Sequence, residues 1–585
     1  MDYDIVIRNG TVVDGTQFPR FRADVGLKGG VIRKIGRIPS GKATRELDAT
    51  NCIVAPGFID LHTHYDAQIF WDPYCTPSGW HGVTTFVIGN CGFGFAPVKP
   101  ADRDRSLLMM TRTEQIPYES MKVGMPITWE TFPEFLEALR RIPKGVNLMT
   151  YVPLSPLVIY VMGLEASKTR AATPAEQREM KRLLNQAMDA GACGFSLQRF
   201  GPNSPQADYD GTPMPTDVMV DEDILVLADV LRERDEGFIQ VTQMPYPSEA
   251  VKRKFLETLA SRAQRPIFHN SIIAFDDAPA EKAEEELAWV SACNSRGLRI
   301  FAQGFTLRSY TYFTLEHWNL YDSSPAWNFA MQGPKEERKK RLADPDVLRR
   351  MRQETDDGTL NLFGLGGPVS QLLITNVAGH KDLEKYVGRR VGEVAAQRGQ
   401  HAIDTIAELS IAGDLDVEFR TGGVNGGTDP NRTTSLVKGT YTLAGVSDGG
   451  AHTKFFNGGA FTTDFLSWLV RETGKVTLEF AHYHLSYMPA RAAGLTDRGM
   501  IREGAAADII IYELDKLSRD PEWEYVTLRD LPANEWRRVQ YSKGYRWTIV
   551  NGQVTFDGGK ATDARPGKVL SPNTLHVESQ RSAVA

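Results

Sequence analysis

The sequence is poor in cysteine: it has five in 585 residues, and their spacings form no tight pair. An odd, scattered set argues against a disulfide framework and favours a reducing compartment. Long apolar runs are also missing, since no stretch approaches the roughly 18 consecutive apolar residues of a membrane-spanning helix. The first residues, MDYDIVIRNG, lack the basic and apolar segments of a signal peptide. We therefore expect a cytoplasmic protein with no membrane partner.

A strong excess of charge of either sign is absent as well. The net charge is −6, from 67 basic and 73 acidic residues that are scattered along the chain. This balance argues against a nucleic-acid or polyanion partner. The hydrophobic content of 42% is that of an ordinary globular protein. The oligomeric state, including a homo-oligomer, stays open at this point.

Both ends of the chain have the pattern of short strands joined by tight turns. The segments DYDIVIRNGTVVDG and ADVGLKGGVIRKIGRI alternate around Asn-Gly and Gly-Gly turns, and WTIVNGQVTFDGGKAT repeats the pattern near the other end. Two similar ends around one long middle predict a single β domain built from residues 1–54 and 485–560. Residues 561–585 are predicted to be a C-terminal tail.

The middle of the chain, residues 55–484, alternates buried-strand runs with helical stretches. Examples are the strand runs VTTFVIGNC and GFIQVTQM and the helical stretch PAEQREMKRLLNQAMDAG. This alternation indicates parallel βα units, and over roughly 400 residues a closed (β/α)8 barrel is the simplest arrangement. Two segments, near 98–145 and 304–350, exceed ordinary loop length and are predicted to be insertions.

The second insertion is dense in aromatic residues, as in FTLRSYTYFTLEHWNLYDSSPAWNF. Insertions of this kind can cap the mouth of a barrel and line a pocket, and we predict that role here. The alternative is a small separate core under a long loop.

Two histidines one residue apart end an apolar run in the segment APGFIDLHTHYD. Residues i and i+2 of a strand point to the same face, so His62 and His64 project together. They would lie at the C-terminal end of a barrel strand, where catalytic groups gather. Two neutral imidazoles on one face are half of a tetrahedral zinc site. The alternative is a pair of structural histidines.

The motif PGFIDLHTH resembles the first-strand signature of the amidohydrolase superfamily. The segment HGVTTFVIGNCGFGFAPV is similar to the second-strand region of its D-aminoacylase branch, the N-acyl-D-amino-acid deacylases. The segments GVSDGGAH, DRGMIREGAAADIIIYELDKL and WTIVNGQVTFDGGKATDARPGKVL resemble later motifs of that branch, in the same order. The resemblance covers nearly the whole chain. It implies a metal-dependent barrel with a β-sandwich built from both termini.

The resemblance also implies roles for individual residues. It makes Cys91 a metal ligand and Asp448 a group that both binds metal and moves protons. A metal would deprotonate the thiol, and it would offset the burial of the carboxylate. The alternatives are a buried small hydrophobic residue for Cys91 and a turn former for Asp448.

Two further ligands of the branch are less well matched. The fifth-strand position where histidine is expected holds Gln243, whose amide oxygen is a weaker zinc ligand than imidazole. The sixth-strand candidate is His269. We therefore expect one firmly held Zn²⁺ and leave open a second, labile ion. The branch also grips a substrate carboxylate with Lys and Arg, which are missing at the matching positions. Lys454 is the candidate substitute.

His452 lies near Asp448 and is expected either to support the metal ligands or to contact the substrate. The resemblance implies a zinc-dependent amidohydrolase that cleaves the amide bond of an N-acyl amino acid or of another acyl or aryl amide. Asp448 would accept a proton from water and then protonate the leaving nitrogen. The alternatives are a cyclic amide, a lactone or a decarboxylation at the same site, or a metal-binding barrel without catalysis.

Overall fold

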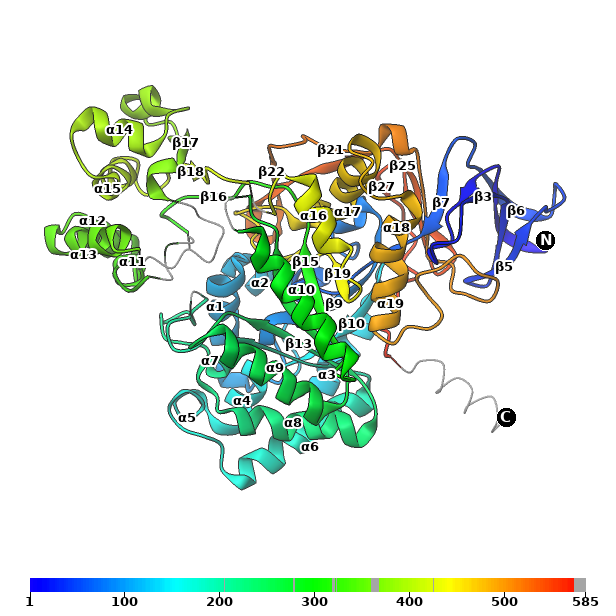
Figure 1. The fold of residues 1–585 in the computed structure, drawn as a ribbon, viewed down its shortest axis with the longest axis horizontal. Helices are drawn as coiled ribbons and strands as arrows, with labels where there is room; N and C mark the ends of the chain where they lie inside the picture. Colours follow the sequence, from blue (N-terminus) through cyan, green and yellow to red (C-terminus); the bar gives the residue numbers. More distant parts are fainter. Residues whose placement is uncertain are drawn as a thin grey trace.

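The computed structural model (Figure 1) describes residues 1–204, 206–276, 279–317, 321, 324–358, 368–424 and 426–572. The predicted tail beyond residue 572 and a few positions of the predicted 304–350 insertion lie outside these ranges. Within the described ranges, no helix has the length and apolar character needed to cross a membrane.

Parallel strands form a barrel in the middle of the molecule (Figure 1). In chain order they are β8 (Phe58–Asp60), β9 (Val83–Ile88), β10 (Asn147–Thr150), β12 (Gly194–Arg199), β13 (Phe238–Gln243), β14 (Ile267–Ile273), β15 (Ile300–Phe305) and β19 (Thr442–Ala444). Neighbours pair in parallel, with the short β11 (Val152–Pro153) linking β10 to β12. A bridge between Thr63 and Gly449 closes the ring. The predicted (β/α)8 barrel is confirmed.

Helices cover the outer face of the barrel (Figure 1). They include α6 (Pro174–Ala190), α8 (Asp221–Arg234), α9 (Glu249–Ala263) and α10 (Ala280–Ser295). The strands are therefore buried on both faces and read as continuous apolar runs. Helix α6 shows how the sequence sets these bounds. It begins at a capping box of Thr173 and Glu176 and ends at Gly191, whose φ of 110° suits a residue without Cβ.

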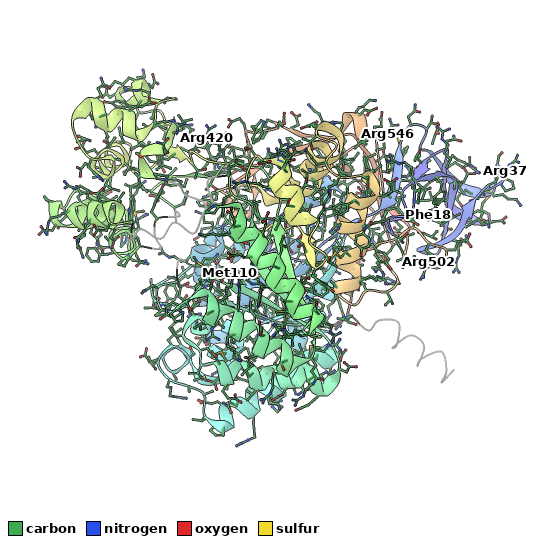
Figure 2. All side chains as sticks on the ribbon, in the orientation of Figure 1. Phe18, Arg37, Met110, Arg420, Arg502 and Arg546 are labelled. Carbon is green, nitrogen blue, oxygen red and sulfur yellow. The ribbon has the colours of Figure 1, made fainter. Side chains whose placement is uncertain are left out.

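Strands from both ends of the chain share one sheet beside the barrel. Its order is β27 (Lys560–Ala561), β26 (Gln553–Asp557), β25 (Tyr545–Val550), β20 (Ile509–Tyr512), β7 (Ile53–Pro56), β2 (Thr11–Val12) and β3 (Phe21–Arg22). A second sheet has the order β5 (Val31–Gly36), β4 (Asp24–Lys28), β1 (Tyr3–Arg8) and β6 (Ala43–Asp48). The β-sandwich built from both termini is confirmed. Charged side chains such as Arg37, Arg502 and Arg546 cover its outside (Figure 2).

The apolar side chains between the two sheets form a core of their own. Ile5, Val25, Val54, Ile509 and Ile549 belong to it and are buried. The chain leaves this core at β7 and enters the barrel at β8, with only Gly57 between them. A side chain at Gly57 would meet Thr84, since its Cβ would lie 2.3 Å from Thr84 Oγ1. The sandwich therefore anchors the first barrel strand, which leads into His62 and His64.

The segment near 98–145 packs closely on the barrel. It contains α1 (Arg103–Glu114), α2 (Tyr118–Gly124) and α3 (Phe132–Arg141). Trp129 and Phe135 hold it to the main core, where their ring centroids lie 5.0 Å apart. Glu114, the last residue of α1, is 1% exposed. This segment therefore reaches into the interior of the molecule.

The aromatic segment near 304–350 leads into a helical lobe that Figure 1 shows apart from the barrel. The lobe contains α11 (Pro325–Met331), α12 (Lys335–Leu342), α13 (Pro345–Asp356), α14 (Val391–Arg398) and α15 (Ala402–Ala412). Its aromatic rings pack on each other: Tyr321 stacks on Trp327 with centroids 5.2 Å apart, and Phe313 lies 5.7 Å from Tyr321. Among its described residues, only Phe305 lines the pocket described below. The described residues of this segment therefore form a small separate core, which is the alternative given above, and they do not form the predicted lid.

Candidate metal centre

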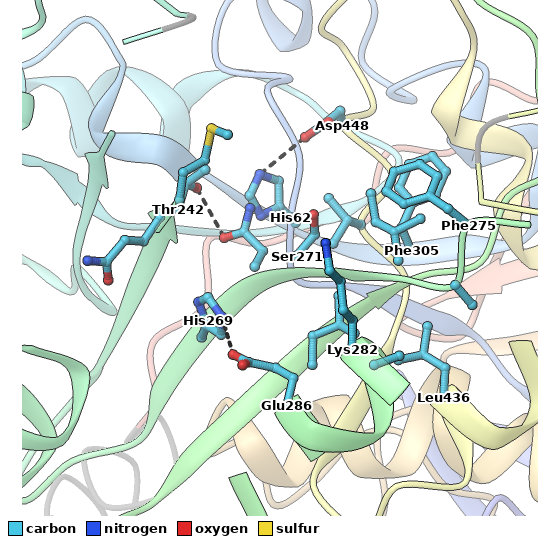
Figure 3. A pocket seen from close by; sticks show the side chains of 18 of the residues that line it. His62, Thr242, His269, Ser271, Phe275, Lys282, Glu286, Phe305, Leu436 and Asp448 are labelled. Carbon is cyan, nitrogen blue, oxygen red and sulfur yellow. Dashed lines mark hydrogen bonds and ion pairs between the residues drawn. The ribbon is translucent and has the colours of Figure 1, made fainter. Parts of the chain in front are cut away.

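Side chains from three barrel strands converge at one end of the barrel (Figure 3). His62 and His64 follow β8, Cys91 follows β9, and Asp448 follows β19. In a parallel barrel the C-terminal ends of all strands meet at the same rim, so residues far apart in the chain become neighbours there. His62, His64 and Cys91 place one ligand atom each within 4.8 Å of one another.

The distances between donor atoms suit a single ion. Cys91 Sγ lies 3.4 Å from His62 Nε2 and 3.9 Å from His64 Nε2. Asp448 Oδ1 lies 3.1 Å and 3.7 Å from the same two nitrogens. Tetrahedral zinc with bonds of about 2.0–2.3 Å separates its ligands by about 3.3–3.7 Å. His62, His64 and Cys91 therefore fit three ligand positions of a tetrahedral metal ion, and the Asp448 carboxylate lies beside the two imidazoles.

Burial sets the protonation of this group. Burial raises the pKa of the Cys91 thiol well above its usual range, so only a bound cation would make it a thiolate. Burial lowers the pKa of His64 and keeps the ring neutral, which is the form that binds metal. Burial alone would raise the pKa of Asp448, but the contacts with His62 and His64 outweigh it and hold this pKa well below its usual range.

The backbone at this rim is bent into an uncommon conformation. Cys91, Asp448 and His452 have φ of 58°, 49° and 51°, a left-handed region that few residues other than glycine adopt. Hydrogen bonds hold two of the bends: Asp448 N donates to His62 O at 3.2 Å, and Cys91 N donates to Gln240 Oε1 at 2.7 Å. Such conformations cluster at functional sites because the surrounding structure must impose them.

Three polar residues that the sequence analysis did not single out support the donors. Gln303 on β15 contacts His62 Nδ1 at 3.4 Å, which leaves Nε2 facing the other donors. Thr242 Oγ1 lies 3.1 Å from Cys91 Sγ and donates to Asn270 Oδ1 at 3.0 Å. Alternate residues of β13 and β14 point into the barrel, and Thr242 and Asn270 are on that inward face. They could have been identified from the sequence only if the residue at which this alternation begins in each strand had been known.

The same alternation places Gln243 and His269 differently from the prediction. Gln243 is one residue beyond Thr242 on β13, and it lines the wider pocket. His269 precedes Asn270 on β14, and its Nε2 lies 3.1 Å from Glu286 Oε1 of α10 (Figure 3). The structure therefore does not bring His269 to the four donors, because a shift of one residue along a strand reverses the face.

His452 and Lys454 also have different surroundings. His452 Nε2 lies 3.5 Å from Glu114 Oε2, and that oxygen lies 3.8 Å from His64 Nε2. Lys454 Nζ instead forms an ion pair with Glu535 at 2.9 Å. His452 lines the pocket, and Lys454 is not part of its lining. Glu114 carries no local sequence signal, because its position is set by the packing of α1.

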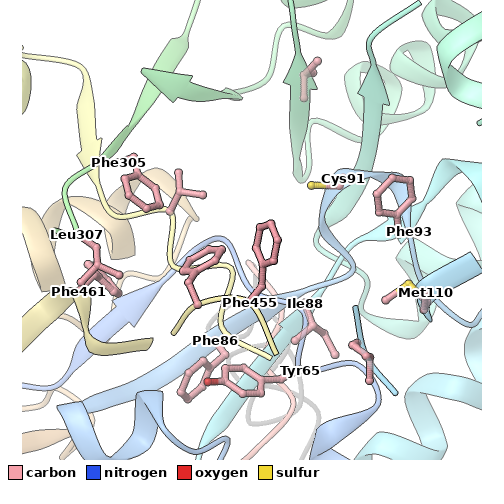
Figure 4. Packing of buried hydrophobic residues seen from close by; sticks show 14 of the residues in the cluster. Tyr65, Phe86, Ile88, Cys91, Phe93, Met110, Phe305, Leu307, Phe455 and Phe461 are labelled. Atoms are coloured by element: carbon pink, nitrogen blue, oxygen red, sulfur yellow. The ribbon is translucent and has the colours of Figure 1, made fainter. Parts of the chain in front are cut away.

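A cavity of about 610 Å³ opens beside the donors. One part of its wall is apolar and includes Ile272, Phe275, Phe305, Leu436 and Phe455. Figure 4 shows Phe305, Phe455 and Cys91 in one packed apolar cluster. Figure 3 shows the Lys282 side chain among the lining residues. The site therefore offers a large apolar space next to a polar end.

Comparison with known proteins places the chain in a family. The model of the amidohydrolase family matches residues 45–288 and 368–556. The N-acyl-D-aspartate deacylase of Alcaligenes xylosoxydans xylosoxydans is 27% identical over 99% of this chain and 97% of its own length. A crystal structure of D-aminoacylase covers 97% of this chain and 100% of its own, with a TM-score of 0.65 and 22% identity.

A second solved structure has the same fold. It is the N-acyl-D-glutamate deacylase of Bordetella bronchiseptica, complexed with zinc and a phosphonate inhibitor, with a TM-score of 0.64, 21% identity, and coverage of 97% of this chain and 100% of its own. The chain belongs to the amidohydrolase family. It is a hydrolase that acts on carbon–nitrogen bonds other than peptide bonds.

Proposed function

We propose that this amidohydrolase holds one firmly bound Zn²⁺ with His62, His64 and Cys91, next to Asp448, and that Asp448 is the catalytic proton carrier. The observation that carries the proposal is the convergence of these atoms: one ligand atom each of His62, His64 and Cys91 lie within 4.8 Å of one another, and Asp448 Oδ1 lies 3.1 Å and 3.7 Å from the two imidazoles. Soft thiolate and imidazole donors in this number favour zinc over magnesium or calcium.

Zinc supplies a Lewis acid that polarises a carbonyl and makes water easier to deprotonate. The side chain of Asp448 is 22% exposed, whereas those of His62 and His64 are 1% exposed. Asp448 is thus the donor that a substrate in the cavity can reach. It accepts a proton from the attacking water and delivers a proton to the nitrogen that leaves.

The cavity supports an amide with a large apolar acyl group or side chain. Burial of such a group against the apolar wall stabilises the complex by about 25 cal/mol per Å² of apolar surface removed from water. An N-acyl amino acid of this kind is the substrate class that we favour. Lys282 is better placed than Lys454 to contact its carboxylate, because Lys282 lines the cavity while Lys454 pairs with Glu535.

The experiment compares metal content and amide hydrolysis in the wild type and two variants. The substrate panel holds N-acyl-D- and N-acyl-L-amino acids with short and long acyl chains, plus a cyclic amide and a lactone. We expect near-stoichiometric zinc and faster hydrolysis of the long-chain substrates. A barrel that binds metal without catalysis would hydrolyse none of them.

The variant Asp448→Asn is expected to keep its fold and most of its tightly bound metal, but to lose at least ~10²-fold in turnover, because an amide cannot carry the proton. Added zinc should not restore the rate. His62→Asn should instead lose the metal. Asp515→Asn, at an exposed position, is the control. Near-normal turnover in metal-replete Asp448→Asn would contradict the role of Asp448 and point to His452.

A further inference from the structure

The cavity beside the metal centre extends beyond the ring of barrel strands. Asn270 of β14 lines it from the barrel interior, where it accepts a hydrogen bond from Thr242. Other lining residues belong to helices outside the strands, namely α10 and α16 (Pro430–Val437). The cavity therefore has an arm between β14 and these two helices. The outer arm, as we call it, is lined by Ser271, Phe275, Lys282, Leu287, Phe305 and Leu436.

Strand β14 has one extra residue where the outer arm begins. Its pairing with β15 shifts between Asn270 and Ile272, so Ser271 has no partner in the ladder. Such a bulge bends a strand and redirects its side chains, and it is common beside active sites. Ser271 is exposed although Asn270 and Ile272 are buried, and it lines the cavity. Because its side chain is small, it leaves the passage open between the metal centre and the outer arm.

The outer arm has an apolar wall. Leu287 of α10 and Leu436 of α16 contribute to it, together with Phe275 and Phe305. Figure 3 shows Phe275, Phe305 and Leu436 on one side of Lys282. Each methylene group that a ligand buries against such a wall is worth about a fourfold gain in affinity. The outer arm therefore favours a ligand with a branched aliphatic or aromatic side chain.

One cation of the outer arm is available to an anion. Lys282 is exposed and lines the cavity, and its Nζ has no hydrogen bond or ion pair with another described residue. The other lysine and the arginine of the lining are engaged, since Lys252 pairs with Glu286 at 3.1 Å and Arg432 donates to Phe275 O at 2.6 Å. Lys282 is thus the lining residue best able to bind a carboxylate.

Acidic residues on the same wall disfavour a second anionic group. Glu284 and Glu286 of α10 both line the cavity. Burial alone would raise the pKa of Glu286, but its contacts with His269 and Lys252 outweigh this effect and hold the pKa below its usual range. A ligand with two anionic groups would bring one of them toward these carboxylates, which costs binding free energy. The outer arm therefore suits one carboxylate and one apolar group.

We propose that the outer arm binds the amino-acid half of the substrate, with its carboxylate on Lys282 and an apolar side chain against Leu287 and Leu436. The inference rests on the proposed amide hydrolysis at the metal centre. In an N-acyl amino acid, the carboxylate and the side chain are attached to the same carbon, next to the nitrogen that leaves, so one arm can hold both. The substrate is then an N-acyl derivative of leucine, phenylalanine or a similar amino acid, and aspartate and glutamate are disfavoured.

The first test removes the charge of Lys282. Kinetics are measured with N-acetyl-leucine, in the enantiomer that the enzyme accepts, and with its carboxamide. Lys282→Gln should raise KM for the carboxylate by at least ~10-fold, as expected for a lost charged contact, and should leave the carboxamide unaffected. Lys254→Gln, at an exposed position of α9 outside the cavity lining, should match the wild type. An equal loss on both substrates, or no loss on either, would overturn the carboxylate contact.

The second test changes the side-chain preference. In the wild type, kcat/KM should be at least ~10-fold higher for N-acetyl-leucine than for N-acetyl-alanine, because three more carbon atoms are buried, and lowest for N-acetyl-aspartate and N-acetyl-glutamate. Leu287→Lys should shift the preference toward glutamate by at least ~10-fold. Leu183→Lys, at a half-buried position of α6, should keep the preference of the wild type. A wild type that hydrolyses the acidic substrates as well as N-acetyl-leucine would overturn the apolar subsite.

A binding measurement separates this inference from the proposed function. N-acetyl-leucine is titrated into chelator-treated full-length protein by calorimetry, so that no turnover occurs, and thermal unfolding checks that each variant is folded. Lys282→Gln should weaken binding by at least ~10-fold. Unchanged affinity in Lys282→Gln, or no binding by the wild type, would overturn the subsite. Normal binding without hydrolysis of any N-acyl amino acid by the zinc-loaded wild type would instead count against the proposed function alone.

Discussion

At the scale of single residues, the role of a histidine depends on the strand face it occupies. His62 and His64 share one face and meet Cys91. His269 lies on the other face of β14, in a buried network where Glu286 contacts both His269 and Lys252 at 3.1 Å. Glu286 is 7% exposed, so its charge depends on these partners. His269 is thus better explained by stability than by metal binding.

We therefore expect His269→Gln to keep the tightly bound metal and to lower the free energy of unfolding by about 1–3 kcal/mol, the typical effect of a disturbed buried hydrogen bond. Metal content and urea unfolding provide the measurement. His380→Gln, at a half-buried position where the side chain makes no capping hydrogen bond, is the control and should stay within about 0.5 kcal/mol of wild type. Loss of the tightly bound metal from His269→Gln would instead support the predicted role of His269 as a metal ligand.

At the scale of elements, the loops after the barrel strands hold the donors in place. The loop after β19 folds back so that Gly458 lies against Ser447, the residue before Asp448. A Cβ at Gly458 would lie 1.4 Å from Ser447 O, far inside any contact distance. Glycine at this position therefore lets the loop hold Asp448 near the two histidines.

Gly458→Ala should push the Ser447–Asp448 segment away while leaving every donor side chain in the protein. We expect at least ~10-fold weaker binding of the tight metal, as for other disturbances around metal ligands, with a matching loss of turnover at limiting zinc. Gly423→Ala, where a Cβ would meet nothing within 4 Å, should bind metal normally. Unchanged metal affinity in Gly458→Ala would show that the loop does not position Asp448.

At the scale of the whole molecule, buried neutral histidines connect segments that are distant in the chain. His81 Nδ1 contacts Thr463 Oγ1 at 2.7 Å, and its Nε2 contacts Gln540 O at 3.0 Å. Burial lowers the pKa of His81 to about 4, below the usual value of about 6.5. Between about pH 6.5 and pH 4, His81 therefore binds a proton in the unfolded chain but stays neutral in the folded chain.

The titration of His81 should accordingly lower the free energy of unfolding as the pH drops from about 6.5 to 4, by about 1.4 kcal/mol per pH unit. His81→Gln removes this titration, although it can shift stability by a constant amount at every pH. Urea unfolding at pH 7 and pH 5 should show the wild type losing about 2 kcal/mol more than the variant. Parallel pH profiles would contradict a neutral buried His81.

Much of the architecture could be predicted from the sequence because it depends on local patterns. Alternating strands at both ends and the βα repeat between them are properties of neighbouring residues. The His62–His64 pair could be recognised in the same way, since two residues apart on a strand means one face. Cys91 and Asp448 required the resemblance to a family, because no local pattern connects them to the histidines.

Only the tertiary structure decided which other side chains meet these four. Glu114 reaches His452 through the packing of α1, although 337 residues lie between the two in the chain. Lys454 is drawn to Glu535, and the register of β14 turns His269 toward Glu286. The physical reason is the same in each case: burial and pairing energies depend on partners brought together by the closed barrel, and a sequence pattern does not contain those distances.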